Sequence, residues 1–221
     1  MADNYLENRF EEVFGKKTVV KRVGHTLDEL LLRNRSTRGY NRSFVVRREW
    51  LEQIVAVNTK IPSARNQQVL RFKIVTQGDD ARKMLPLIKM GGALPELHLP
   101  FAGTEPEAFI IVCSTVPETK MVDIDMGISV QSMLLKAAEM GLNGLIIGAF
   151  DKKQVAEAFH LPADPLLVVA IGKGAEHIEL VPIHENTVTQ DGSSHPVSHA
   201  YYRENGIHYV PKLCLNDLLI D

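Results

Sequence analysis

Cysteine is scarce in this sequence: only Cys113 and Cys214 occur among the 221 residues, and they lie far apart. Without a C-x-x-C spacing, the two residues argue against a disulfide framework, a zinc site or a dithiol redox pair. Cys113 stands in the apolar run AFIIVCS, so we expect its thiol to be buried in the core and unreactive.

Long hydrophobic runs and an excess of charge of either sign are also missing. The apolar stretches stay far below the roughly 18 residues that a membrane helix needs. The 25 basic and 27 acidic residues give a formal charge of -2, so the overall charge does not favour nucleic acid or an anionic membrane as a partner. The amino-terminal stretch MADNYLENRFEEVFG is acidic and broken by charges, unlike a signal peptide, so we expect a cytoplasmic protein.

The remaining composition is ordinary for one globular domain, with a hydrophobic content of 45%. Residues 5–14 are predicted to form a short helix, and a basic linker follows it. Residues 1–24 therefore precede a single domain over residues 25–221. Helical and strand patterns occur in mixed order along this domain, which predicts an α+β fold around one sheet.

Two helices are predicted near the start of the domain. Thr26 and Glu29 have the spacing of a capping box, in which each side chain satisfies the other's free backbone N–H, so a helix is expected over 27–34. Apolar residues at one-face spacing predict a second helix over 48–58. It must end before Pro62, because proline restrains the residue that precedes it.

A helix predicted over 125–141 is the most informative of the chain. Nearly all of its surface is apolar, so it should be covered on most sides, as a central helix or one packed on a partner subunit is. Gln131 falls nearer the apolar side, where a buried amide needs hydrogen-bond partners. These partners could be backbone carbonyls or a bound ligand. The polar residues form one narrow stripe: Ser129, Ser132, Lys136 and Glu139.

Strand patterns occur on both sides of this helix. Alternation of apolar and polar residues over 69–76 predicts a half-buried strand. Continuous apolar runs at 109–115 and 166–171 predict strands that are covered on both faces. Between the helix over 125–141 and the strand over 166–171, Asp151 should cap a short helix that ends near Phe159.

Two stretches have no regular repeat. The Gly- and Pro-rich residues 91–107 are predicted to form a long loop, and loops of this length are commonly functional. The carboxyl-terminal residues 195–221 are rich in apolar and aromatic side chains but show no compact helical or strand repeat. This tail should therefore dock on another surface, such as a second chain.

One basic segment has the chemistry of an anion site. RNRSTRGY places Arg33, Arg35 and Arg38 beside the hydroxyls of Ser36 and Thr37. Guanidinium groups pair with phosphate oxygens and hydroxyls add directed hydrogen bonds, a combination that suits a phosphate monoester. Taken alone, the segment fits a solvated helix end as well, and the polar PSARNQQ segment fits an ordinary loop.

Together, four segments resemble the nitroreductase family in the same order. The family's R-x-S-x-[RK] segment after a short helix is matched by residues 34–38, and its P-S-[SA]-x-N-x-Q segment by residues 62–68. GLNGLIIGAF at 141–150 resembles the end of the family's buried helix and the turn that follows it. Lys212 stands where the family has a basic residue near the carboxyl terminus. The resemblance runs from about His25 to the end of the chain.

The resemblance implies an FMN-binding protein of α+β class. Its fold would be a three-layer α/β/α sandwich with a mixed, mostly antiparallel sheet, in an intertwined homodimer whose carboxyl-terminal extension crosses to the partner subunit. Arg35, Ser36 and Arg38 would hold the flavin phosphate and ribityl chain, with Arg38 also near the N1–C2 edge of the ring, and Lys212 would join at the phosphate.

The rest of the cofactor site would come from two further segments. The loop after Pro62 would face the flavin from the second subunit, and the turn at Gly148 would present backbone N–H groups to N5 and O4. The candidate cofactor-binding residues are Arg35, Ser36, Thr37, Arg38, Pro62, Ser63, Ala64, Asn66, Gln131, Ile147, Gly148 and Lys212.

Three departures from the family pattern each remove a possible flavin contact. Asn34 stands where many relatives have arginine, Ala64 replaces a frequent serine, and Cys214 falls where a second basic residue often lies. Arg33 or Arg65 could compensate for these losses. The sequence is equally consistent with both arginines being ordinary exposed residues.

The resemblance implies ping-pong catalysis, in which NADH or NADPH reduces FMN, leaves, and is replaced by a nitroaromatic or quinone-like acceptor. No protein acid or base is required, because the cofactor carries the hydride and solvent supplies protons. A specialised flavin dehydrogenase or dehalogenase and a non-catalytic FMN-storage protein remain alternatives. The loop over 91–103 would decide the acceptor.

No metal site is expected, because none of these histidines has a ligand spacing: His98, His184, His195, His199 and His208.

Overall fold

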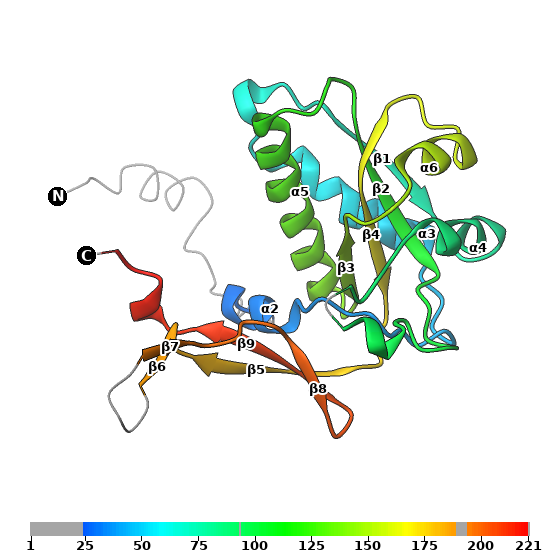
Figure 1. Cartoon of the computed structure of the whole chain (residues 1–221). Helices are drawn as coiled ribbons and strands as arrows, with labels where there is room; N and C mark the ends of the chain where they lie inside the picture. Colours follow the sequence, from blue (N-terminus) through cyan, green and yellow to red (C-terminus); the bar gives the residue numbers. More distant parts are fainter. Residues whose placement is uncertain (1–23, 93, 189–193, 221) are drawn as a thin grey trace, which may run out of the picture.

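The computed structural model describes residues 24–92, 94–188 and 194–220 (Figure 1). The predicted helix over 5–14 lies outside these residues. The helices are α2 (Leu27–Arg33), α3 (Arg48–Val55), α4 (Asp79–Met84), α5 (Lys120–Glu139) and α6 (Lys152–Ala158). The strands are β1 (Leu70–Val75), β2 (Ala108–Ser114), β3 (Asn143–Ile147), β4 (Asp164–Gly172), β5 (His177–Ile183), β6 (Asn186–Val188), β7 (Ser194–Pro196), β8 (Tyr202–Glu204) and β9 (Ile207–Leu213).

The main sheet has the strand order β1-β2-β4-β3, and neighbouring strands are antiparallel throughout. All residues of β2 are buried, and so are those of β4 after its first residue. This confirms the two strands that continuous apolar runs predict, since a strand covered on both faces has no exposed side on which polar residues are tolerated. A parallel bridge from Ser36 to Gly144 extends the sheet beyond β3.

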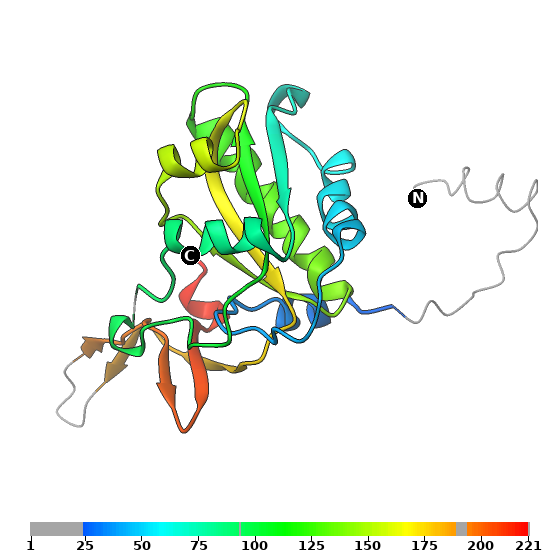
Figure 2. The same cartoon turned by 90° about the vertical axis from the view of Figure 1, so that its right-hand side faces the viewer.

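Helices cover both faces of this sheet (Figures 1 and 2). Alternate residues of β2 point to opposite sides, so Ile110 packs in a cluster with residues of α3 and α5, whereas Phe109 packs in a cluster with residues of α4 and α6. The α+β class is confirmed, with a sheet between two apolar clusters. Among the described residues, no helix combines the length and the apolar character that a membrane crossing requires.

The Cys113 thiol is buried in the cluster that contains Phe109, as expected from its apolar run. Burial raises its pKa from 9.0 to about 11. The reactive thiolate should therefore be about 100-fold rarer at neutral pH than for an ordinary cysteine.

In a Cys214→Ser variant, we expect native protein to react with a thiol reagent at least about 100-fold more slowly than protein unfolded in urea. Equal rates would contradict this placement.

The capping prediction at Thr26 is confirmed. Its side chain accepts from the Glu29 backbone N–H at 3.2 Å, and the Glu29 carboxylate accepts from the Thr26 backbone N–H at 3.0 Å. Asp151 likewise caps α6 by accepting from the Gln154 backbone N–H. The helix predicted over 48–58 is present as α3, continued by a 3-10 turn at Ala56–Thr59.

The predicted start of the central helix was wrong. Helix α5 begins at Lys120 and not at Asp125, because the Thr119 side chain accepts from the Val122 backbone N–H and caps an earlier turn. Thr119 has no acidic residue three positions later, so the capping-box pattern that identifies α2 is missing here. Within the polar stripe, Ser129 is buried and donates to the Asn58 side chain.

One side of α5 is open in the single chain. Met121 is 50% exposed and Ile124 is 45% exposed, and Gln131 is exposed further along the helix. These residues recur at spacings that place them on one face. The prediction that most of the helix is covered therefore holds within this chain only for the side that faces the sheet.

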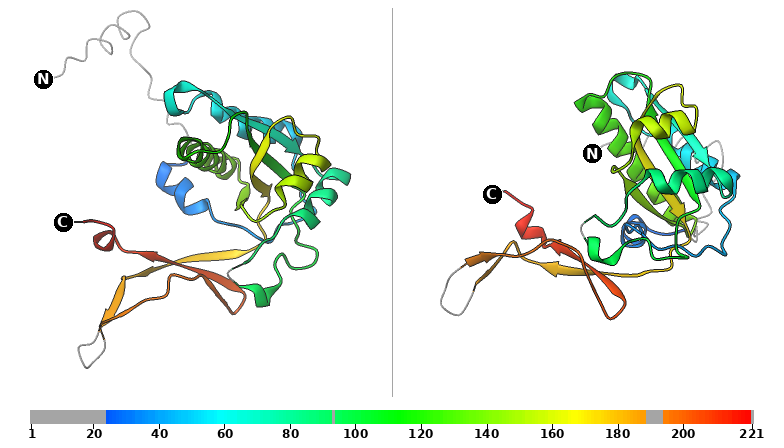
Figure 3. Two further views of the ribbon diagram at one scale, coloured as in Figure 1. Left: turned by 45° about the horizontal axis from the view of Figure 1, so that its top comes forward. Right: turned by 45° about the vertical axis from the view of Figure 1, so that its right-hand side comes forward.

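The carboxyl-terminal tail has regular structure, contrary to expectation. β9 pairs in parallel with β5 and antiparallel with β8, and β6 pairs with β7. These elements, in residues 177–188 and 194–220, form a C-terminal extension that reaches away from the main sheet beneath α2 (Figures 1 and 3). Sequence periodicity missed it because β9 contains Pro211 and Lys212 and takes its partner strand from about 30 residues earlier in the chain.

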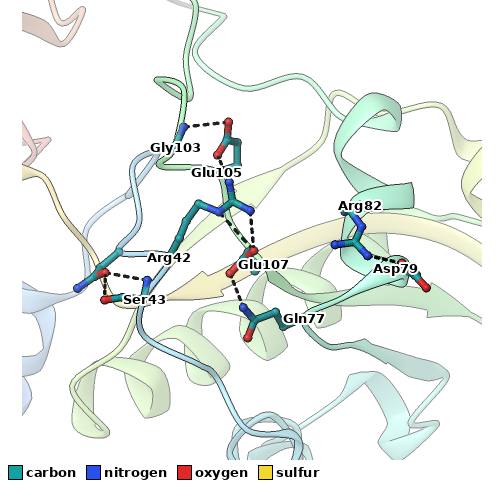
Figure 4. Close-up of polar contacts among 9 residues, drawn as sticks. Arg42, Ser43, Gln77, Asp79, Arg82, Gly103, Glu105 and Glu107 are labelled. Atoms are coloured by element: carbon teal, nitrogen blue, oxygen red, sulfur yellow. Dashed lines mark hydrogen bonds and ion pairs between the residues drawn. The ribbon is translucent and has the colours of Figure 1, made fainter.

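The predicted loop over 91–107 contains only a short 3-10 turn at Pro95–Leu97 among its described residues. Its end is fastened to the segment after α2 by Arg42, which forms ion pairs with Glu105 at 3.2 Å and Glu107 at 2.9 Å (Figure 4). The Glu105 carboxylate also accepts from the Gly103 backbone N–H. These contacts hold the loop beside the sheet.

Candidate functional site

A pocket of about 270 Å³ lies where α2, α5, β3 and the C-terminal extension meet. Its walls combine apolar side chains with a concentration of basic and amide groups. The polar residues that line it are Asn34, Arg35, Ser36, Arg38, Gln131, Tyr201, His208 and Lys212.

Five of the predicted cofactor-binding residues therefore share this pocket. Arg35, Ser36 and Arg38 come from the segment after α2, and Lys212 comes from β9, far away in the sequence. Gln131 reaches the pocket from α5 and is exposed, so the expected burial of its amide was wrong. The Asn34 amide nitrogen lies 3.5 Å from the Gln131 side-chain oxygen. Three cationic groups thus face one hollow, which suits a dianionic ligand.

Arg35 has an unsatisfied donor at this pocket. One of its Nη atoms donates to the Leu31 carbonyl, whereas Nε is buried and has no hydrogen-bond partner among the described residues. Burial lowers the pKa of the Arg35 guanidinium, so the charge is partly desolvated. A buried donor without an acceptor costs free energy, and an anionic ligand would remove that cost.

Arg38 is positioned by contacts on several sides. Its guanidinium lies 4.4 Å from the centre of the Tyr201 ring, and Nη1 donates to the Ser36 carbonyl at 3.1 Å. Its backbone N–H donates to the Glu176 carboxylate at 2.6 Å. The Tyr201 hydroxyl is buried and has no partner within the described part of the chain. Tyr201 and Arg35 thus each present an unsatisfied donor near one pocket.

His208 and Glu176 form a buried pair behind Arg38, with 3.4 Å between Nε2 and a carboxylate oxygen. Burial lowers the pKa of His208 more than the nearby Glu176 carboxylate raises it. Tyr201, His208 and Glu176 were not predicted from the sequence. The only hint in the sequence was the pair of tyrosines in the tail. Their location could not be predicted without knowing that β5 pairs with β9.

Thr37 does not reach the pocket. It is buried, its hydroxyl donates to the Arg35 carbonyl at 3.2 Å, and its backbone N–H donates to the Gly144 carbonyl at 3.0 Å. This residue fixes the basic segment along the edge of β3. Its role in the single chain is therefore structural.

The loop after Pro62 lies at a second hollow of about 430 Å³, which Pro62 and Ser63 line together with Asp125 of α5. The buried Asp125 carboxylate accepts from the Ala64 backbone N–H at 2.8 Å and fixes the loop. Asn66 is exposed and has a φ of 55°, a conformation that costs free energy in a non-glycine residue. Within one chain, neither Ala64 nor Asn66 lines the basic pocket.

The turn at Gly148 lines neither hollow. β3 carries Gly144 and Ile146 at the basic pocket, and Gly148 follows the end of the strand, where it is exposed. Four residues of strand span about 13 Å, so the turn lies well beyond the basic groups along one edge of the sheet. Ile147 is buried between them.

Gly144 is required for the packing of this edge. A Cβ built there would lie 2.3 Å from Leu134 Cδ2 and 3.0 Å from the Ala170 carbonyl oxygen. We expect Gly144→Ala to lower the free energy of unfolding by about 1–3 kcal/mol, because the backbone contact cannot move aside easily. Gly148→Ala is the matched control, since its Cβ would meet nothing closer than 4.0 Å. Urea titrations that give equal stabilities for the two variants would contradict this packing.

The nitroreductase family model matches residues 31–173. The chain belongs to the nitroreductase family. The match includes the basic segment, the loop after Pro62 and the turn at Gly148, and it ends before the C-terminal extension.

Solved nitroreductase-family structures are similar to the chain in fold. One is a nitroreductase family protein from Clostridium difficile 630, with 22% identity and a TM-score of 0.56 over 69% of this chain and 86% of that one. A protein assigned as a nitroreductase from Exiguobacterium sibiricum, solved in complex with FMN, has 22% identity and a TM-score of 0.57 over 69% and 90%. A protein assigned as an NAD(P)H:FMN oxidoreductase from Staphylococcus epidermidis has 20% identity and a TM-score of 0.56 over 69% and 88%. The comparison with curated proteins gave no match.

Proposed function

We propose that this nitroreductase-family chain is an FMN-dependent oxidoreductase that uses NADH or NADPH to reduce nitroaromatic or quinone-like acceptors in a ping-pong reaction. The observation that carries the proposal is the gathering of Arg35, Arg38 and Lys212 at one pocket, where Arg35 and Tyr201 also have buried donors without a partner among the described residues. A flavin phosphate supplies the negative charge and the acceptor oxygens that these groups lack. The family assignment and the FMN-bound relative support the same cofactor.

The residues present fit FMN from its phosphate outward. Arg35 and Tyr201 line the pocket and each has a buried donor without a partner in the described part of the chain, which would reach the phosphate after a side-chain shift, and Lys212 adds a third source of positive charge. Ser36 and Gln131 line the same pocket and offer polar groups to the ribityl chain. In the direction of the ring, the edge strand β3 leads towards Gly148, which is exposed.

The remaining contacts are proposed to come from a second subunit. The three-layer domain would form an intertwined homodimer in which Pro62, Ser63, Ala64 and Asn66 of one subunit face the flavin bound by the other. Two features support this arrangement: the open apolar face of α5, a helix that lines both hollows, and the exposed end of the C-terminal extension. At that end the exposed apolar residues are Leu215, Leu218, Leu219 and Ile220.

When bound, FMN accepts a hydride from the nicotinamide nucleotide and passes the electrons to the acceptor. The protein's part is to position and to stabilise. Backbone N–H groups at Ile147 and Gly148 would orient the N5 and O4 edge, and the Arg38 guanidinium would stabilise negative charge near N1 and the C2 carbonyl. The loop over 91–103 would lie over the ring and select the acceptor. No side-chain acid or base is needed.

The test uses purified full-length protein under anaerobic conditions. Yellow protein whose flavin absorbance is bleached by NADH or NADPH and restored by a nitroaromatic or a quinone is the expected result. Colour that persists with both nucleotides would contradict turnover and favour a storage role. Bleaching without recovery by either acceptor class would overturn the proposed acceptors and favour a specialised flavin dehydrogenase or dehalogenase. Protein that neither contains nor binds FMN would overturn the proposal.

A further inference from the structure

We propose that His184, Cys214 and Asp217 form a zinc site that fastens the end of the C-terminal extension. One nitrogen, one sulfur and one oxygen ligand atom from these residues lie within 4.8 Å of one another. The sequence argued against a metal site because no local motif joins these residues. The sheet brings them together, so the spacing that matters is spatial and not sequential.

The pairing of β5 with β9 sets the positions of two ligands. In this parallel pair Ile183 lies opposite Leu213, so the residues that follow, His184 and Cys214, leave the sheet side by side. The Cys214 backbone N–H donates to the Ile183 carbonyl at 3.0 Å and continues the strand pairing to the ligand itself. The separation of the two ligands is therefore fixed by backbone hydrogen bonds.

The third ligand is supplied by a turn. Asp217 follows Cys214 by three residues in a 3-10 turn, Leu215–Asp217, which is closed by the hydrogen bond from the Asp217 N–H to the Cys214 carbonyl. This C-x-x-D spacing is the spacing of the two cysteines in many zinc sites. Asp217 Oδ1 accepts from the Glu185 backbone N–H at 3.2 Å, an outer contact of the type that orients a ligating carboxylate.

Donor chemistry and separation both favour zinc. A thiolate with an imidazole and a carboxylate is a ligand set that suits Zn²⁺ better than Mg²⁺ or Ca²⁺, which prefer oxygen alone. In a tetrahedral zinc site the ligand atoms lie about 3.5 Å apart. His184 Nδ1 is 3.1 Å from Asp217 Oδ2, so this pair of ligand atoms needs only a small shift to reach that separation. His184 is largely exposed, which leaves a fourth position open to water.

The site would have a structural consequence for the flavin pocket. Cys214 lies two residues beyond Lys212, at the end of the strand that places this lysine. A metal that joins β5, β9 and the following turn would stabilise this strand end, because metal binding adds to the stability of the state that forms the site. The inference does not depend on flavin binding.

The test measures metal in the full-length protein without an affinity tag. After dialysis, elemental analysis should find about one zinc per chain, and Co²⁺ added to chelator-treated protein should give a thiolate charge-transfer band. Cys214→Ser and His184→Ala should each reduce bound zinc at least tenfold and abolish that band or shift it strongly. His199→Ala, which changes an exposed histidine of the same extension, should leave both readings unchanged.

Three results would overturn the site: no bound zinc and no cobalt band in the unaltered protein, binding that Cys214→Ser and His184→Ala leave intact, or equal loss in His199→Ala. Flavin content and bleaching are recorded on the same samples. A colourless protein that binds zinc contradicts only the proposed flavin function, and a yellow active protein without zinc contradicts only the metal site.

Discussion

In the proposed FMN-binding homodimer, replacing Ile124 with aspartate is expected to separate the two subunits and to remove most of the flavin. Ile124 is 45% exposed on the open apolar face of α5, one residue before Asp125, which lines the hollow at Pro62. A carboxylate buried without a partner in a subunit interface costs about 3–5 kcal/mol, which weakens association by more than about 100-fold. Analytical ultracentrifugation and flavin absorbance measure both effects on one sample.

Ile124→Leu is the matched control, because it keeps the size and the apolar character of the side chain. It should leave the dimer and the flavin content unchanged. An Ile124→Asp protein that remains dimeric with full flavin would show that this face of α5 is not the interface. A monomer that retains all its flavin would show that one chain holds the cofactor alone.

Replacing Arg38 with alanine is expected to weaken FMN binding by about 1–3 kcal/mol, a roughly 5- to 150-fold rise in Kd, because the variant lacks the charged hydrogen bond that we propose between Arg38 and the cofactor. Arg38 is held in the pocket by the Tyr201 ring and the Ser36 carbonyl, so its charge is already in place before the ligand arrives. Isothermal titration of flavin-free protein measures the change. The effect should be smaller at high salt, since charge attraction is screened.

Arg48→Ala serves as the control for this experiment. Arg48 is an exposed arginine of α3 that pairs with Glu52 and lines neither hollow, so its loss should leave the flavin affinity unchanged. Equal FMN affinity in Arg38→Ala and in the unaltered protein would remove Arg38 from the site. Thermal unfolding of the flavin-free variants separates lost binding from lost folding.

Local signals in the sequence were sufficient for most of the fold. The capping box at Thr26 and the cap at Asp151 fix helix starts through hydrogen bonds to neighbouring residues, so they can be read without tertiary context. The strands β2 and β4 could also be identified locally, because a strand buried between two helical layers has a continuous apolar run. The start of α5 was missed because Thr119 caps it without the acidic residue that completes the pattern.

The C-terminal extension could not be predicted in this way. Its strands are stabilised by pairing between β5 and β9, whose partners are about 30 residues apart, and local pattern carries no information about such a partner. The positions of Tyr201 and His208 beside Arg38 depend on that pairing. So does the proximity of His184 to Cys214, which no spacing in the sequence indicates. By contrast, Arg35, Ser36 and Arg38 lie close along the chain, so their shared pocket could be anticipated from spacing.

The most direct test of the two-chain flavin site is a mixed dimer. One differently tagged chain carries Arg38→Ala and the other carries Asn66→Ala, and dimers that contain both are isolated by their two tags. If each site combines the basic segment of one chain with the loop of the other, both defects fall in one site and the second site is intact. About half of the sites should then bind FMN with unaltered affinity. Mixed dimers in which no site recovers, although each parent dimer binds FMN weakly, would contradict a cofactor held between two subunits.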